Sequence, residues 1–207
     1  MNANIDSGIE LPLMESFFTI QGEGFYSGTP AYFLRIGGCD VGCYWCDVKD
    51  SWDPKIHPLI SIDEIVNRVC YENHSNTVVV TGGEPLMWDM YTLTNLLHNK
   101  KYLVHLETSG SHKITGVWDW ICLSPKKNEP PLKTIYSEVN ELKIIVRNSD
   151  DFRWAETHRK FVSKKCVLYL QPEWSVRDKI MPKIVDYVLK NNGWKISLQT
   201  HKYLNIP

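Results

Sequence analysis

Short runs of apolar, β-branched and aromatic residues alternate with helical patterns along most of the chain, and this alternation limits its fold more than any other feature. Strands that alternate with helices favour a largely parallel sheet. A complete eightfold barrel needs about 250 residues, so 207 residues favour an α/β fold that is an incomplete, TIM-like barrel of about six parallel strands with few helices. The runs predicted as strands are residues 31–36, 77–81, 102–107, 117–123, 141–146, 167–170 and 194–198.

Capping signals mark the helices between these strands. Ser61-Ile62-Asp63-Glu64 has the form of a capping box, and the apolar residues that follow it lie on one helical face. Further helices are expected over residues 89–98, from 149–151 onward and over 179–189, the last ending near Asn192-Gly193. No helical pattern separates the strand at 102–107 from the strand at 117–123, or the latter from the strand at 141–146.

Composition and charge exclude several classes of protein. The formal net charge is -1 and 23% of the residues are charged, whereas an electrostatic nucleic-acid binder has a strongly basic face. No apolar run reaches the length of a membrane span, and residues 1–12 lack the basic-then-apolar pattern of a secretion signal. We therefore expect one cytoplasmic domain over residues 1–207, with no nucleic-acid or membrane partner.

Three of the six cysteines fall within eight positions, as Cys39-x-x-x-Cys43-x-x-Cys46. In a reducing compartment, clustered cysteines serve as metal ligands or redox groups more often than as disulfides. The cluster follows a predicted strand directly, and ligands of parallel α/β sheets bind at the carboxyl ends of strands. The remaining cysteines lie singly in apolar segments and are predicted to be inert and buried: Cys70, Cys122 and Cys166.

Three chemistries fit the cluster. A structural zinc site takes four ligands, and no fourth ligand stands out in the sequence. A thioredoxin-like redox pair uses Cys43 and Cys46 and leaves Cys39 unexplained. A cubane iron–sulfur cluster normally takes four thiolates, so one held by three keeps an iron open to another ligand. The spacing alone favours this last site only modestly over zinc.

The wider sequence around the cysteines resembles that of radical S-adenosylmethionine (SAM) enzymes. In these enzymes an aromatic residue, here Trp45, precedes the last cysteine of the same three-cysteine pattern. Thr81-Gly82-Gly83-Glu84-Pro85 resembles the GGEP motif of that superfamily, which holds the amino group of SAM. The resemblance therefore implies a [4Fe-4S] cluster on Cys39, Cys43 and Cys46, with SAM beside it.

Further motifs over nearly the whole chain are similar to those of the 7-carboxy-7-deazaguanine synthase family. They lie at residues 18–24, 28–35, 107–110, 123–126, 141–143, 171–172 and 199–207. This resemblance implies a carbon–nitrogen lyase that converts 6-carboxy-5,6,7,8-tetrahydropterin to 7-carboxy-7-deazaguanine with loss of ammonia, on the route to queuosine and other 7-deazapurines. It also implies a homodimer and an electron donor of the flavodoxin or ferredoxin class.

The resemblance assigns roles to individual residues. Arg35 is expected to pair with the substrate carboxylate, Glu107 with the N–H edge of the pterin, and Pro207 to reach the substrate through its carboxylate. The full set expected at the substrate is Ile20, Gln21, Gly22, Glu23, Arg35, Thr81, Glu107, His201 and Pro207. The set expected at SAM is Trp45, Gly83, Glu84, Ser124, Pro125, Lys126 and Gln171.

One position departs from the family pattern. Many members have Thr or Ser two residues after the last cluster cysteine, where the hydroxyl helps to hold Mg²⁺ against the substrate. This chain has Val48, which has no side-chain oxygen. Asp47, Asp50 or water are the remaining magnesium ligands, since magnesium prefers oxygen donors. Another cation, or none, is the alternative.

Two other functions compete with the synthase. A radical SAM activase that abstracts hydrogen from a protein glycine shares the cysteine spacing and the small size, but has no use for the set of Gln21, Arg35 and Glu107. A zinc-stabilised binding module would contain zinc and would not react with SAM.

Overall fold

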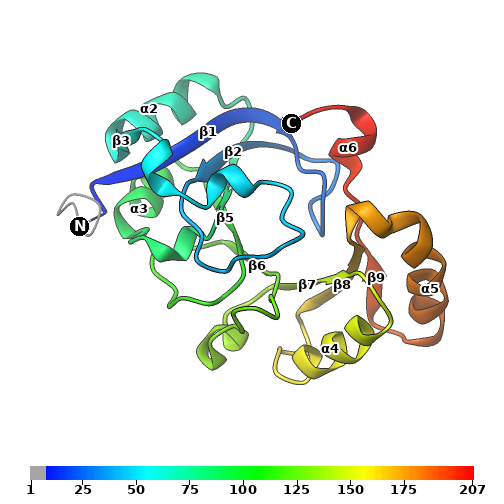
Figure 1. The fold of residues 1–207 in the computed structure, drawn as a ribbon. Coiled ribbons are helices and arrows are strands. Elements are labelled where there is room, and N and C mark those ends of the chain that lie inside the picture. The colour runs from blue at the N-terminus through cyan, green and yellow to red at the C-terminus, as the bar shows by residue number, and fades with distance from the viewer. Residues whose placement is uncertain (1–7) are drawn as a thin grey trace.

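The fold is built on one nine-stranded sheet with the strand order β3-β1-β2-β4-β5-β6-β7-β8-β9 (Figure 1). It is taken from a computed structural model that describes residues 8–207. β2 and β4 to β9 run parallel to one another, whereas β1 runs antiparallel to both β2 and β3. The strands are β1 Glu10–Ile20, β2 Pro30–Ile36, β3 Leu59–Ser61, β4 Thr77–Gly82, β5 Leu103–Thr108, β6 Trp120–Leu123, β7 Glu141–Val146, β8 Val167–Pro172 and β9 Trp194–Ile196.

This sheet is the incomplete barrel that the sequence predicts. β3 and β9 form its two edges and do not pair, so the barrel stays open. Seven strands are parallel among residues 8–207, one more than the predicted six. All seven predicted runs overlap strands, and no α-helix lies between β5 and β6 or between β6 and β7. We propose that the chain is a single domain, because one sheet runs through all of it.

Within residues 8–207, α2 and α3 pack at the first half of the sheet and α4 and α5 at its second (Figure 1). The capping box is confirmed, since the Ser61 hydroxyl accepts a hydrogen bond from the Glu64 N–H at 3.3 Å. The helix predicted over residues 179–189 lies within α5, and its cap, Asn191, comes one residue before the predicted Asn192. The helices are α2 Ile62–Glu72, α3 Tyr91–Asn99, α4 Asp150–Arg159, α5 Arg177–Lys190 and α6 Thr200–Leu204.

Side chains of the central strand β7 point alternately to the two faces of the sheet. In β7, Leu142, Ile144 and Val146 are completely buried on the helix-covered face. Lys143 and Ile145 point to the other face and line the interior of the barrel. This period of two is what allows one strand to supply both core and site residues.

The cysteines outside the cluster divide differently from the prediction. Cys122 and Cys166 are buried, as expected, but Cys70 is exposed. Cys70 follows Val69 on α2, and Val69 is the last residue of the buried stripe of that helix. One further residue rotates the side chain by about 100°, away from the sheet.

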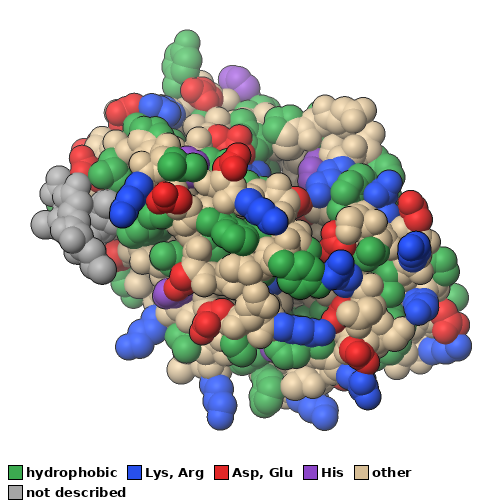
Figure 2. Space-filling model, viewed as in Figure 1, with side chains coloured by type: hydrophobic (Ala, Val, Ile, Leu, Met, Phe, Trp, Pro, Cys, Tyr) green, Lys and Arg blue, Asp and Glu red, His purple; other side chains and the backbone are tan. Residues whose placement is uncertain are grey.

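The surface shows no large field of one sign on the face drawn in Figure 2, where acidic and basic side chains are interspersed. Within residues 8–207, no helix has the length and apolar character needed to cross a membrane. The expectation for the N-terminal segment 1–12 lies partly outside the described residues.

Candidate active site

A cavity of about 600 Å³ opens at the carboxyl ends of the parallel strands. The strand ends and the loops that follow them bring together segments from residue 17 to residue 207. Pro125 is buried and Asp50 is exposed, and neither side chain lines the cavity. The predicted site residues that do line it are Ile20, Gln21, Gly22, Glu23, Arg35, Cys39, Cys43, Trp45, Cys46, Asp47, Thr81, Gly83, Glu84, Glu107, Ser124, Lys126, Gln171, His201 and Pro207.

The three clustered cysteines lie in the loop after β2, at one end of the cavity. Backbone bonds hold this loop, from the Cys39 N–H to the Trp52 carbonyl at 3.2 Å and from the Cys46 N–H to the Cys43 carbonyl at 2.9 Å. Burial raises the pKa of the Cys39 and Cys43 thiols. No three His, Cys, Asp or Glu side chains within residues 8–207 converge on a point where one metal ion would sit.

The glycine turn after β4 packs directly against the cysteine loop. The Gly83 N–H donates to the Ile36 carbonyl at 2.9 Å, and the Glu84 N–H donates to the Gly38 carbonyl at 2.8 Å. A Cβ atom on Gly83 would lie 2.8 Å from the Cβ of Cys39, so a larger residue does not fit here. The turn and the loop thus form one cradle, which fits a cluster on the cysteines with SAM against the turn.

Glu84 has a different part in this cradle from the one expected. Its carboxylate is only 1% exposed and accepts four hydrogen bonds from protein donors. The Leu86 N–H and the Thr108 hydroxyl reach Oε1 at 3.1 and 2.6 Å, and the Ser109 N–H and hydroxyl reach Oε2 at 2.7 and 2.5 Å. A carboxylate has about four acceptor positions, so Glu84 fixes the turn and leaves backbone carbonyls to accept from a ligand.

The side chains expected around SAM form a second group. Lys126 donates to the Ser124 carbonyl at 2.5 Å and to its hydroxyl at 2.7 Å, and its ammonium lies 5.8 Å from the Trp45 ring centre. Burial lowers the pKa of Lys126, opposed by Cys43. Gln171 is buried, and its Oε1 accepts from the Ser197 hydroxyl at 2.7 Å.

Arg35 lies near the end of β2 beside Thr81, its parallel neighbour in β4. Its Nε donates to Oε1 of Glu15 at 2.5 Å across the β1–β2 pair. No hydrogen bond joins Nη1 or Nη2 to another group within residues 8–207. The fork of the guanidinium therefore stays open to a carboxylate in the cavity.

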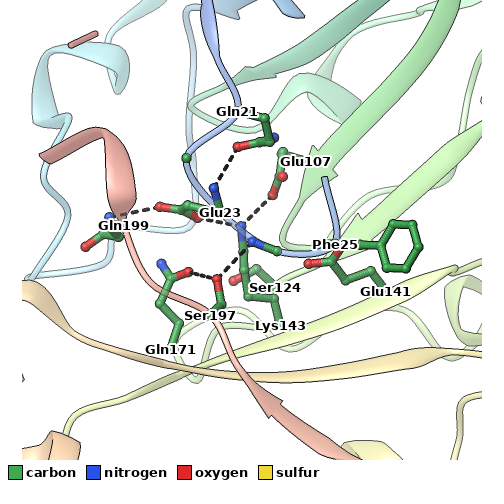
Figure 3. Close-up of polar contacts among 12 residues, drawn as sticks. Gln21, Glu23, Phe25, Glu107, Ser124, Glu141, Lys143, Gln171, Ser197 and Gln199 are labelled. Carbon is green, nitrogen blue, oxygen red and sulfur yellow. Dashed lines mark hydrogen bonds and ion pairs between the residues drawn. The ribbon is translucent and has the colours of Figure 1, made fainter. Parts of the chain in front are cut away.

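A buried ion triad crosses the interior of the barrel (Figure 3). The Lys143 ammonium donates to Glu23 at 2.6 Å and to Glu107 at 2.9 Å. Burial by itself would raise the pKa of Glu23, but Lys143 and hydrogen bonds from Lys143 and Gln199 outweigh it and lower the pKa to about 2. Two carboxylates that the sequence assigns to the substrate are thus paired with one lysine.

The loop between β1 and β2 is tied to the C-terminal segment. The Gly22 carbonyl accepts from the Thr200 N–H at 2.9 Å. A Cβ atom on Gly22 would lie 2.8 Å from the Cβ of His201, so only glycine allows this approach. The Gln21 side-chain oxygen accepts from the Glu23 N–H at 3.1 Å. Pro207 lines the cavity, and its oxygen accepts from the Thr19 hydroxyl at 3.3 Å.

The residues present do not fit a magnesium site of the expected kind. Val48 lines the cavity without an oxygen to offer. The Asp47 carboxylate is paired with the Lys202 ammonium at 2.7 Å. Asp50 is exposed and turned away, with its carbonyl bonded to the His57 ring at 2.8 Å. A cation already occupies the position where Asp47 would meet Mg²⁺.

Among the lining residues that the sequence did not assign to the site, Lys143, Gln199 and Lys202 bond to residues that it did assign. A lysine between the apolar residues Leu142 and Ile144 was a signal available for the first, because a buried lysine needs a partner. The other two lie in a segment whose family match was noted, but nothing in their spacing shows that they reach Glu23 and Asp47.

Comparison with known proteins agrees with this geometry. Residues 34–122 match the Radical SAM superfamily. A 7-carboxy-7-deazaguanine synthase from Flavobacterium psychrophilum is 54% identical over 98% of this chain and 96% of its own length. Another from Synechocystis sp. is 44% identical over 96% of this chain and 94% of its own. The crystal structure of QueE from Escherichia coli matches with a TM-score of 0.82 and 28% identity, over 95% of this chain and 96% of that one.

These relatives cover the chain almost from end to end, including the cysteine loop, the glycine turn and the C-terminal segment. They favour the synthase over both the activase and the zinc-module alternatives, and the structural match confirms the open barrel. The chain therefore belongs to the 7-carboxy-7-deazaguanine synthase family of radical SAM enzymes.

Proposed function

We propose that this protein is the carbon–nitrogen lyase that converts 6-carboxy-5,6,7,8-tetrahydropterin to 7-carboxy-7-deazaguanine with loss of ammonia, in the biosynthesis of queuosine or another 7-deazapurine. One observation carries the proposal. A single cavity is lined by the cysteine loop and the glycine turn and also by Arg35, Glu107 and Pro207. Groups suited to a cofactor and groups suited to a small anionic substrate thus face the same space.

Cys39, Cys43 and Cys46 would hold the [4Fe-4S] cluster, with SAM against Gly83. When bound, the cluster and SAM supply radical chemistry that removes and returns a hydrogen atom of the substrate. The protein contributes orientation. Glu84 fixes the turn through its four donors, so that backbone carbonyls there accept from the methionyl ammonium group.

Around the substrate, this chain supplies charge complementarity at two edges. The open fork of Arg35 donates to the carboxylate, for which two parallel N–H donors are the best match. Glu107, paired with Lys143, accepts from the N–H edge of the pterin. Correct placement of both edges supplies much of the rate enhancement available to an enzyme that binds a reactive cofactor.

The loop at residues 21–28 and helix α6 cover the cavity on the side where the barrel does not close. Thr200 bonds to Gly22 through both its N–H and its hydroxyl, at 2.9 and 3.0 Å. Gln199 bonds to Glu23 at 2.9 Å. These bonds keep bulk water away from the site, which protects reactive species from side reactions.

No step of the reaction is assigned to magnesium, because the residues at the expected position do not fit it. Val48 offers no oxygen and Asp47 is paired with Lys202. The positive charge at this edge of the cavity comes from the ammonium of Lys202, 2.7 Å from Asp47.

The remaining partners are proposed from membership of the family. They are a flavodoxin- or ferredoxin-class electron donor, a second copy of this chain in a homodimer, and a cytoplasmic setting. Tyr44, which follows Cys43, is 59% exposed, so the cysteine loop reaches the surface from which an electron donor would approach.

The test is anaerobic reconstitution with iron and sulfide, followed by turnover with dithionite, SAM and the carboxytetrahydropterin. The expected result is 7-carboxy-7-deazaguanine with ammonia released, and SAM not consumed in proportion to product. A loaded enzyme that cleaves SAM without forming the deazaguanine would overturn the proposal and favour the activase. A colourless, zinc-containing protein would favour the binding module.

A further inference from the structure

Lys143 lies between the apolar residues Leu142 and Ile144 of strand β7, and only 4% of it is exposed. Its ammonium contacts Glu23, from the loop after β1, and Glu107, near the end of β5 (Figure 3). Both carboxylates line the cavity, and so does Lys143 itself. A single side chain thus links two recognition groups that come from different parts of the fold.

The other titratable groups near Lys143 leave these two carboxylates as its main partners. Glu141, on the same strand, accepts from the Phe25 N–H at 3.1 Å and the Trp120 indole at 3.2 Å. Burial raises the pKa of Glu141, and it raises the pKa of the Cys122 thiol well above its ordinary value.

Two further basic side chains lie near this triad, those of Lys126 and His201. The Lys126 ammonium is directed at Ser124, at 2.7 Å from its hydroxyl. Burial lowers the pKa of His201, opposed by Glu23, so the neutral ring is favoured. Burial would lower the pKa of Lys143 too, but Cys122 and the carboxylates of Glu107, Glu23 and Glu141 raise it well above its ordinary value. Lys143 is therefore the cation that balances the charge of Glu23 and Glu107.

A purely structural role would not explain why these three charged groups lie together inside the barrel. Replacing a buried ion pair by apolar residues of similar size is often neutral or stabilising. Here the two carboxylates keep side-chain exposures of 19% and 22% toward the cavity, whereas Lys143 keeps 5%. Lys143 is thus more deeply buried than the two carboxylates, which are the groups exposed to the cavity.

We propose that Lys143 is a positioning residue, which holds the carboxylates of Glu23 and Glu107 at a fixed separation so that they accept the N–H groups of the pterin's 2-aminopyrimidinone edge. This inference rests on the proposed function. It predicts that the lysine controls substrate affinity through the carboxylates and leaves cluster assembly alone.

The effect of pH follows from the charges. In the wild-type protein the pKa of Glu23 is about 2, so the carboxylate stays ionised and KM for the pterin should not depend on its titration between pH 6 and 8. In Lys143→Met the burial remains and the compensating cation is lost, so the pKa of Glu23 rises. KM should then increase by at least about tenfold, and more steeply as the pH falls.

The experiment measures KM and kcat for the carboxytetrahydropterin across this pH range, with iron content determined for each variant. Lys143→Met should raise KM more than it lowers kcat. Lys143→Arg, which keeps the charge, should recover a flat profile. Lys190→Met is the matched control, because Lys190 pairs with Asp186 on the surface of α5 and should leave KM unchanged.

A second variant keeps the test decisive if Lys143→Met does not fold. The double variant Lys143→Met with Glu23→Gln removes one unpaired buried anion together with the cation. It should show a raised KM with a weaker pH dependence. Wild-type KM in any folded variant that lacks the lysine charge would overturn the role of Lys143, whereas absence of deazaguanine from the wild-type enzyme would overturn the proposed function instead.

Discussion

Gly83 and Cys39 approach so closely that a Cβ atom on Gly83 would lie 2.8 Å from the Cβ of Cys39. Real Cβ atoms do not make such a contact, so Gly83→Ala must displace the cysteine loop. We expect this variant to bind much less iron and sulfide after reconstitution. Gly28→Ala is the control, since a Cβ there meets nothing within 4 Å, although the positive φ of 90° strains it as well. Equal iron content in both variants would contradict the close packing of turn and loop.

Glu84→Gln should destabilise the protein as well as the site. The amide nitrogen of glutamine would face donors, either the Thr108 hydroxyl and Leu86 N–H or both donors of Ser109. Leaving buried donors of this kind without an acceptor costs about 3 kcal/mol of unfolding free energy. Urea denaturation measures the loss. Glu64→Gln, whose carboxylate is about half exposed and pairs with Arg68, should change the same quantity by less than about 1 kcal/mol.

Product formation should not depend on magnesium. Enzyme freed of divalent cations by gel filtration should turn over at the same rate with and without added Mg²⁺, at constant iron content. Val48→Thr puts a hydroxyl at the position where the family carries it, and this variant should gain a response to Mg²⁺. A wild-type rate that rises severalfold on addition of Mg²⁺ would show that Asp47 leaves Lys202 to bind the ion.

An extension beyond Pro207 should weaken substrate binding. Pro207 lines the cavity and contacts Thr19, so added residues must pass through the mouth of the site. We expect KM for the pterin to rise by roughly tenfold or more, since small displacements in a site have large effects. Iron content should stay unchanged. The same short tag at the other end of the chain is the control, and equal KM values for the two tagged proteins would remove Pro207 from the site.

Mild acid should destabilise the protein through His105. Burial, opposed by Asp119, lowers the pKa of His105 to about 4 from an ordinary value of 6.5. Between pH 6.5 and about pH 4, His105 therefore binds a proton in the unfolded chain but not in the folded protein. Stability is complete above pH 6.5 and falls as the pH drops toward 4, by up to about 3 kcal/mol.

His105→Phe removes the titrating group while keeping a ring against Tyr26, 4.5 Å away. The pH dependence of its unfolding free energy should be shallower than that of the wild type in denaturant titrations. Parallel curves for the two proteins would show that His105 does not titrate in this range.

The sequence predicted the central strands because their β-branched runs are short, apolar and bounded by turns. It missed β1, whose Pro12 argues against a strand and whose Glu15 and Ser16 interrupt the apolar pattern. Pairing with β2 and with the three-residue β3 overrides that local signal. Helix α6 was missed as well, because five residues carry too little periodicity to be read.

The site residues also divide into those that belong to local sequence motifs and those that only the fold brings together. The cysteines and the glycine turn are local motifs and could be identified directly. The pairing of Lys143 with Glu23 could not be identified, because Glu23 lies 120 positions away in the sequence and only the folded sheet brings the two together. The position of Glu84 was predicted but its role was not, since its donors Thr108 and Ser109 arrive from the end of the next strand.

The apolar interior is divided into two separate clusters that meet at β5, where Val104 belongs to one and Leu106 to the other. The cysteine loop follows β2, a strand of the cluster that contains Val104, whereas Lys143 and Gln171 lie on β7 and β8, strands of the cluster that contains Leu106. Local opening in proteins follows such cooperative units. A ligand that contacts residues from both clusters links them. Hydrogen exchange of backbone amides in β7 to β9 should therefore slow when substrate is bound, even at amides far from the cavity.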